Sequence, residues 1–141
     1  MADEATKITL LGNAGDPVVF TVAAGTAIAK GTLMRISASP QVAIATNTVD
    51  QLFAGIASVE KTATDGVTEL ALWTHGLFEM TCGAAESMVL GAPVKTGAAA
   101  NEVTVMATDV ITGASSCVGV AQETVAGNGS GAVLINVGRT R

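Results

Sequence analysis

The sequence predicts a mainly β protein: a compact barrel or sandwich of short strands, with an extended N-terminal arm and at most one or two short helices. Val and Thr, whose branched Cβ atoms pack well in strands, number 17 and 18 of the 141 residues. Turn signals separate short apolar segments about every 8–12 residues, a spacing typical of sandwiches and barrels. With three Phe, one Trp and no Tyr, the core must be built from many small side chains.

The composition predicts one domain with little surface charge. We expect an arm at residues 1–16 and a single β domain at residues 17–141. Hydrophobic residues make up 49% of the chain, which argues against disorder. Charged residues make up 13%, against about 25% in an average domain, so we expect part of the surface to be covered by a partner. The net charge of −5 argues against nucleic-acid binding, and no apolar run is long enough to span a membrane.

The N-terminal arm has two interpretations. Ile8, Leu10 and Leu11 are apolar, and a turn-forming stretch of Gly, Asn, Asp and Pro follows them at residues 12–17. The segment is either the first strand of the fold or an arm that reaches a neighbouring molecule. The acidic start lacks the basic and apolar regions of a secretory signal, so we expect synthesis in a reducing cytoplasm.

The expected strands follow one another along the whole chain. Each combines alternating or continuous apolar residues with Gly, Pro or Asn at its ends. They are residues 18–22, 32–37, 41–45, 53–59, 67–73, 77–81, 93–95, 103–106, 118–121 and 133–137. Asp65-Gly66 predicts a hairpin turn, and Asn128-Gly129 predicts the last one. A helical turn is compatible with Thr46–Leu52 and with Ala84–Leu90.

The chain also resembles itself. Each half would contain an apolar entry, a glycine turn, a strand, a Gly-Ile/Val-Ala strand, a second turn and a final strand. The matching segments are residues 23–35 with 84–95, 55–57 with 119–121, and the turn at 65–66 with the turn at 128–131. These matches predict half-repeats at approximately 18–81 and 82–138, packed into one barrel-like domain.

No segment carries a strong catalytic or ligand-binding motif, so we predict no catalytic, cofactor or metal site. Cys82 and Cys117 are too few for a disulfide scaffold or a zinc site, and are expected to be free thiols. Either cysteine together with His75 would supply the thiol and the base that a cysteine hydrolase needs at minimum. The Gly127–Gly131 stretch lacks the Lys-Ser/Thr of a phosphate loop, which favours a hairpin turn. Trp73 is expected to be a core or interface anchor rather than a sugar-stacking platform.

Taken together, the motifs resemble the head decoration (capsid cement) proteins of tailed bacteriophages. The resemblance is to a small family long catalogued as a domain of unknown function and sometimes labelled recombinase-like, and it covers about residues 16–138. It rests on the order and spacing of Ala24-Gly25-Thr26-x-Ile28-x-Lys30-Gly31-x-Leu33-Met34, Phe53-Ala54-Gly55-Ile56-Ala57, Gly66 to Trp73, and Gly76. The missing phosphate loop gives the recombinase label no support.

This resemblance implies a β-barrel-like protein that forms trimers on the outer surface of the expanded phage head. Its partners would be the major capsid protein and two further copies of itself, with no nucleic acid and no membrane. We predict that Ile8, Leu10 and Leu11 dock on the capsid. Trp73, Phe78 and Met80 are predicted to form the core or an oligomer contact. Three alternatives remain open: a head spike or tail accessory, a small cysteine hydrolase, and a sugar-binding module.

Overall fold

The protein has the mainly β fold that the sequence predicts: its described residues form strands, turns and the segments that connect them. The computed structural model describes residues 4–9, 17–38, 41–45, 52–97, 99–106 and 117–137. Every predicted strand has a counterpart whose ends differ by at most three residues. Within the described ranges there is no helix, and therefore no helix long and apolar enough to cross a membrane.

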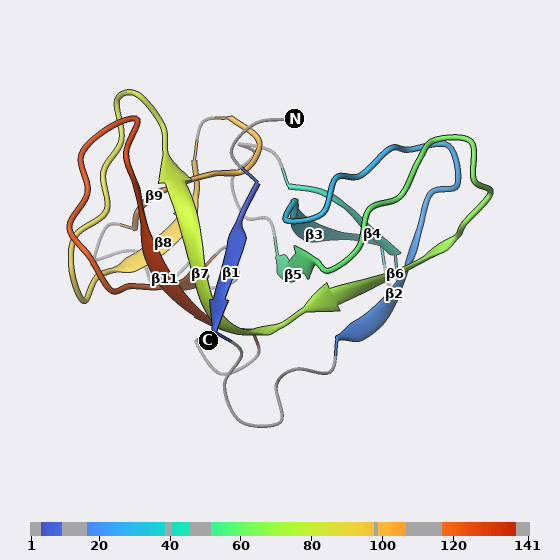
Figure 1. Ribbon diagram of the computed structural model, residues 1–141, viewed down its shortest axis with the longest axis horizontal. Coiled ribbons are helices and arrows are strands. Elements are labelled where there is room, and N and C mark those ends of the chain that lie inside the picture. Colours follow the sequence, from blue (N-terminus) through green and yellow to red (C-terminus); the bar gives the residue numbers. More distant parts are fainter. Residues whose placement is uncertain are drawn as a thin grey trace.

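Two barrels lie side by side along the long axis of the molecule (Figure 1). The first is a closed barrel with the strand order β2-β4-β3-β5-β6. Its strands are β2 (Val18–Val22), β3 (Leu33–Ala38), β4 (Gln41–Ile44), β5 (Phe53–Ala57) and β6 (Glu69–Trp73). β6 leads through Thr74 directly into β7, so one continuous stretch of chain passes from the first barrel into the second.

The second barrel is a six-stranded sheet with the order β1-β7-β11-β10-β8-β9, in which β9 also pairs with β7. Its strands are β1 (Thr6–Thr9), β7 (His75–Cys82), β8 (Pro93–Thr96), β9 (Glu102–Val105), β10 (Cys117–Ala121) and β11 (Ser130–Asn136). Five of these strands therefore close on themselves, and β1 adds a sixth strand along β7 (Figure 1).

The pairings of the two barrels correspond strand by strand. β2 pairs with β4 in parallel and with β6 antiparallel, and β7 pairs with β9 and β11 in the same way. The units divide at Thr74, whereas the sequence placed the division between residues 81 and 82, inside β7. Phe78 and Met80 of β7 correspond to Val18 and Phe20 of β2, sixty positions earlier, and the whole of β7 belongs to the second unit.

One predicted helical turn is wrong, and the other falls largely outside the described residues. Ala84–Leu90 forms a turn followed by a β-bridge between Met88 and Val125. The Met88 N–H donates to the Val125 carbonyl at 2.9 Å, so this backbone is bonded across two loops rather than along a helix. Of the segment Thr46–Leu52, only Leu52 is described, and it is not helical.

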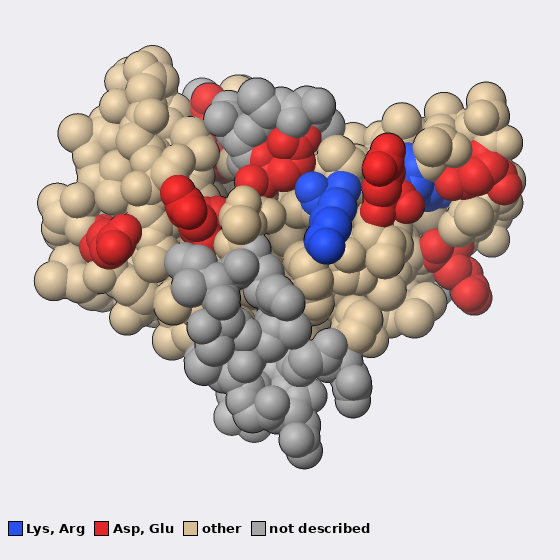
Figure 2. All heavy atoms as spheres, in the orientation of Figure 1, with Lys and Arg blue, Asp and Glu red and all other residues tan. Residues whose placement is uncertain are grey.

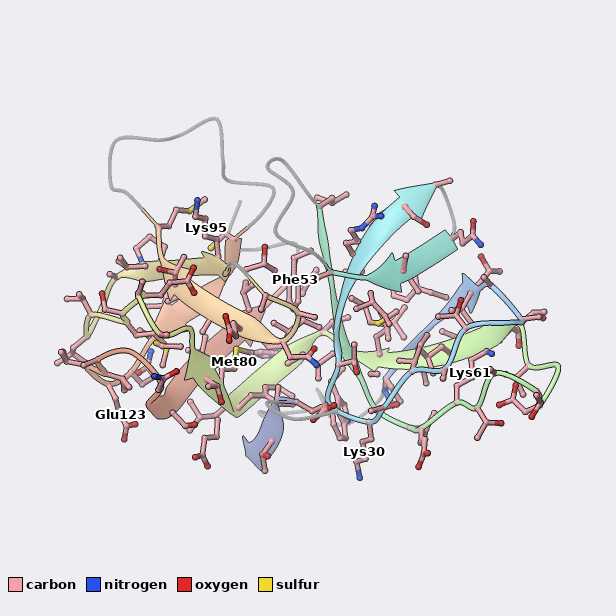
Figure 3. All side chains as sticks on the ribbon, turned by 90° about the horizontal axis from the view of Figure 1, so that it is seen from above. Lys30, Phe53, Lys61, Met80, Lys95 and Glu123 are labelled. Atoms are coloured by element: carbon pink, nitrogen blue, oxygen red, sulfur yellow. The ribbon has the colours of Figure 1, made fainter. Side chains whose placement is uncertain are left out.

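The larger hydrophobic cluster crosses the junction between the barrels. Leu33, Phe53 and Ile56 of the first barrel pack in one cluster with Phe78 and side chains of the second. Figure 3 shows Phe53 and Met80 in the interior on the two sides of this junction. A second, smaller cluster, which includes Met34 and Leu72, fills the first barrel alone.

A buried hydrogen bond also joins the barrels. Asn101, in the turn between β8 and β9, accepts the backbone N–H of Leu33 in β3 at 3.0 Å. Asn101 is 2% exposed and has φ of 65°, a conformation that Asn tolerates better than most residues. One side chain of the second barrel therefore satisfies a buried backbone donor of the first.

Candidate functional site

The structure keeps His75 apart from both cysteines. His75 and Cys82 are the first and last residues of β7, so a strand rise of about 3.3 Å per residue places them about 23 Å apart. Cys117 lies in β10, which is separated from β7 by β11, or about 10 Å of sheet. Neither pair is within hydrogen-bond reach, which argues against a Cys–His nucleophile.

Both cysteines are buried thiols that form no disulfide, and Cys82 is not activated. Burial raises the pKa of the Cys82 thiol, and the Glu86 carboxylate raises it further. Cys117 donates its thiol hydrogen to the Gly119 carbonyl, with a sulfur–oxygen distance of 3.6 Å. Reactive cysteines have the opposite properties, a lowered pKa and an accessible sulfur.

The glycine-rich stretch at Gly127–Gly131 is a turn that leads into β11, as the sequence indicates. The Gly129 carbonyl accepts the Cys82 N–H at 2.9 Å, and the backbone of Ala84 fills the space beside Gly127. The N–H groups of Asn128 and Gly129 donate to the carbonyls of Gly83 and Ala126, at 3.3 and 3.0 Å, so these two backbone donors are used within the chain rather than presented to a phosphate. Among the described residues, no group of three or more His, Cys, Asp and Glu side chains could hold a metal ion.

Trp73, Phe78 and Met80 lie inside the molecule. Their exposed fractions are 8%, 0% and 1%, and all three belong to the cluster that crosses the junction. The rings of Trp73 and Phe78 are 5.6 Å apart at an angle of 46°. Nearly all of this surface is used by the chain's own core, and Trp73 offers little area on which a sugar could stack.

The N-terminal segment Glu4–Thr9, here called the clasp, holds the two barrels together from outside. The Ala5 N–H donates to the Gly31 carbonyl of the first barrel at 2.7 Å, and Ala5 is buried. The next residues form β1, which pairs with Leu77–Glu79 of the second barrel. Beside the clasp lies a hollow of about 410 Å³, lined by Glu4, Ala5, Thr6, Lys30 and Trp73. The Lys30 amino group is 5.6 Å from the centre of the Trp73 ring, in cation–π range.

One of the three predicted docking residues belongs to the clasp. Ile8 lies in β1, so this part of the predicted arm is a strand of the sheet. Leu10 and Leu11 lie outside the described residues. Since β1 belongs to the fold, removing the arm would also remove strand pairing. Deletion of the arm would therefore change folding and docking together.

A buried lysine that the sequence analysis missed holds the loops at the far end of the first barrel (Figure 3). Lys61 is 3% exposed, and its amino group donates to the carbonyls of Ala24, Thr26 and Thr62 at 2.6, 3.0 and 3.2 Å. It also lies 3.4 Å from the Asp65 carboxylate. Its counterpart in the second barrel is the apolar Val125, so the internal repeat does not mark this position as one that needs a buried lysine. In the sequence alone, Lys61 therefore looks like an ordinary surface lysine.

Asp65 should make the first barrel sensitive to acid. Its carboxylate accepts the N–H groups of Val67 and Thr62, each at 2.9 Å. These contacts, led by the bond from Val67, lower the pKa of Asp65 below its ordinary value of 3.8, although partial burial opposes the shift. Because the pKa is lower in the folded state, ionised Asp65 stabilises the fold above the unfolded-state pKa. This contribution is lost as the pH falls through the folded-state pKa.

We therefore expect Asp65→Asn to be less stable than the wild type at pH 7 and the difference to shrink toward pH 2. Urea unfolding of both proteins across this range measures it. Glu69→Gln, which removes a carboxylate from an exposed position of β6, controls for net charge. A deficit of Asp65→Asn that is equally large at pH 2 would contradict the assignment.

Within the part of the chain that the structure describes, large apolar side chains are exposed at three places. Figure 2 shows a face on which charged groups are separated by broad uncharged areas. Among the described residues, the large hydrophobic ones that are 40% exposed or more are Val18 and Val19 in β2, Val59 and Val67 between β5 and β6, and Val89 and Leu90 between β7 and β8. Exposed apolar groups of this kind mark candidate contact surfaces.

The comparisons with known proteins relate this chain to a phage structure through its fold. No family model matches the sequence, and no curated protein matches it. Among solved structures, the fold is similar to that of the head fiber gp8.5 N base of bacteriophage phi29, with a TM-score of 0.50. The similarity covers 84% of this chain and 93% of that one at 16% sequence identity. At this identity, the two chains share a fold.

Proposed function

We propose that the protein is a structural component of a phage head, which binds the outer surface of the expanded capsid and stabilises its lattice as a decoration, or cement, protein. The observation that carries the proposal is the fold similarity to a phage head fiber base over 84% of the chain. The order of the glycine and apolar motifs, which resembles that of decoration proteins, supports it independently. So does the low content of charged residues, 13%.

The mechanism of such a protein is linkage between binding and lattice stability. A ligand that binds only the expanded lattice stabilises that lattice by mass action against the pressure of the packaged DNA. In our proposal the protein is a homotrimer in which all three copies contact the capsid. When one copy dissociates, the two that remain bound keep it near its own binding site. Multivalent attachment of this kind raises the overall affinity without strengthening any single contact.

A second candidate is the base of a head spike or fiber. The structure with the similar fold is itself a head fiber base, and this specific observation favours the alternative. The two functions differ in the number of copies bound to each head and in the positions that these copies occupy. A cement protein covers the lattice at about one copy per capsid subunit, whereas a spike base occupies few positions.

Co-sedimentation with heads of the source phage tests both functions. Purified protein is mixed with unexpanded and expanded heads, and bound copies are counted by densitometry. We expect saturable binding to expanded heads at a stoichiometry near one per major capsid subunit, and little binding to unexpanded heads. Saturation at a small fraction of that number would favour the spike base. Absence of binding to either form would overturn both functions.

The residues that dock on the shell remain a prediction. Ile8, Leu10 and Leu11 follow the anchored start of the clasp, and in our proposal they contact the capsid. Substitutions at Leu10 and Leu11 test this more cleanly than deletion of the arm, because they leave the pairing of β1 with β7 in place.

A further inference from the structure

The repeat assigns each position of β2 a counterpart in β7. Thr21 and Val22 pair in parallel with Gln41 and Val42 of β4. Sixty positions later, Thr81 and Cys82 pair in parallel with Glu102 and Val103 of β9. The isolated bridges Ile28–Lys61 and Met88–Val125 also correspond. The two barrels can therefore be compared residue by residue.

The correspondence fails at one edge. In the second barrel, β11 covers one edge of β7, while β9 and β1 share the other. β1 runs antiparallel to β7 and pairs with Leu77, Phe78 and Glu79. The counterparts in the first barrel are Pro17, Val18 and Val19. No described residue pairs with them on the β4 side.

The side chains at this edge are apolar and exposed. Val18 is 46% exposed, whereas its counterpart Phe78 is fully buried. Val19, 59% exposed, stands where β7 has the exposed charged residue Glu79. Proteins usually protect such edges with charged residues or bulges, because open backbone groups invite another strand. Residues 18–21 of β2 carry no charge at all.

The described residues contain one strand that covers an edge in this way, β1. That strand already pairs with β7, and a copy that donated its β1 to a neighbour would uncover its own β7. We propose that the open edge of β2 at Val18 and Val19 accepts an extended strand of another protein. This strand would run antiparallel to β2 and pair through its backbone, as β1 does on β7. The inference rests on the proposed function, in which the donor of the strand is the major capsid protein.

The binding test compares two matched substitutions. Val19→Lys places a charge on the open edge, and Val59→Lys places the same charge at a similarly exposed position, 51%, in the loop after β5. Thermal unfolding first establishes that both variants fold like the wild type. In co-sedimentation with expanded heads, we expect Val19→Lys to lose about tenfold or more in apparent affinity and Val59→Lys to stay within about twofold.

Hydrogen exchange of the wild-type protein adds a readout that needs no variant. The Val22 N–H donates to the Thr68 carbonyl on the β6 side at 2.9 Å, so the alternating N–H groups of Val18 and Phe20 also point to β6, and that of Val19 points to the open edge. We expect the amide of Val19 to gain protection on expanded heads and those of residues 59–67 to stay unchanged. Protection of the Val19 amide in the free protein would overturn the proposal, since the edge would then be filled by this chain or by a second copy.

The two proposals fail in different ways. Binding of Val19→Lys at wild-type affinity would overturn the assigned edge and leave the head-binding function standing. If the wild type itself binds neither form of the head, the function fails, and the assigned partner fails with it.

Discussion

Replacing Asn101 with alanine is expected to lower the free energy of unfolding by about 2–4 kcal/mol. Alanine would leave the buried N–H of Leu33 without the acceptor it now has at 3.0 Å, a loss of about 1–3 kcal/mol. Alanine would also have to adopt the φ of 65° that Asn101 has, at a further cost of about 1 kcal/mol. Urea unfolding at neutral pH measures the total.

Asn128→Ala is the matched control for this substitution. Asn128 has nearly the same backbone conformation, with φ of 62°, but it is exposed in the turn before β11. Its replacement therefore reports the backbone cost alone. Equal losses for Asn101→Ala and Asn128→Ala would show that the hydrogen bond between the barrels contributes nothing. A larger loss for Asn101→Ala would show that the junction couples the two barrels.

Replacing Gly31 with alanine is expected to cost about 2–5 kcal/mol, because it strains the turn and displaces the clasp. Gly31 has φ of 89°, a region that L-residues rarely adopt. A Cβ atom there would overlap the Ala5 carbonyl oxygen and would lie 2.8 Å from the Glu4 Cβ. The strain contributes about 1–2 kcal/mol, and overpacking typically adds about 1–3 kcal/mol.

The second barrel provides the control for Gly31. Gly91 is the counterpart of Gly31: its φ is 78°, and its N–H donates to Ala121 as that of Gly31 donates to Ala57, both at 2.8 Å. No atom lies within 4 Å of a Cβ built on Gly91. Gly91→Ala should therefore cost only about 1–2 kcal/mol for the strain. Equal losses for the two variants would mean that the clasp adds no stability to the junction.

Those two predictions concern contacts that the sequence analysis did not foresee. Asn101 and Leu33 are 68 positions apart, and nothing near Asn101 indicates its partner. Gly31 belonged to a recognised turn pattern, but its contact with Ala5 depends on where the N-terminal segment crosses the barrel. Lys61 was overlooked because three of its acceptors are carbonyls, which any residue could supply.

Local chemistry was sufficient for the strands themselves. Alternating apolar residues in β6 and β7 and the Gly and Pro residues between segments predicted the elements, because strand and turn preferences act over a few residues. The turn at Gly127–Gly131 was predicted for the same reason. The helical turn proposed at Ala84–Leu90 was wrong because a long-range bond to Val125 overrides its weak local preference.

By itself, then, the sequence determined the class of the fold, the positions of its strands and turns, and the low content of charged residues. Only the tertiary structure decided which strands are neighbours, including the parallel pairs β2–β4 and β7–β9. It also decided that Thr6–Thr9 forms a strand on β7 while the matching edge of β2 lacks a described partner. The physical reason is that side-chain pattern and backbone preference are local properties. The occupancy of a sheet edge, in contrast, depends on where distant segments meet.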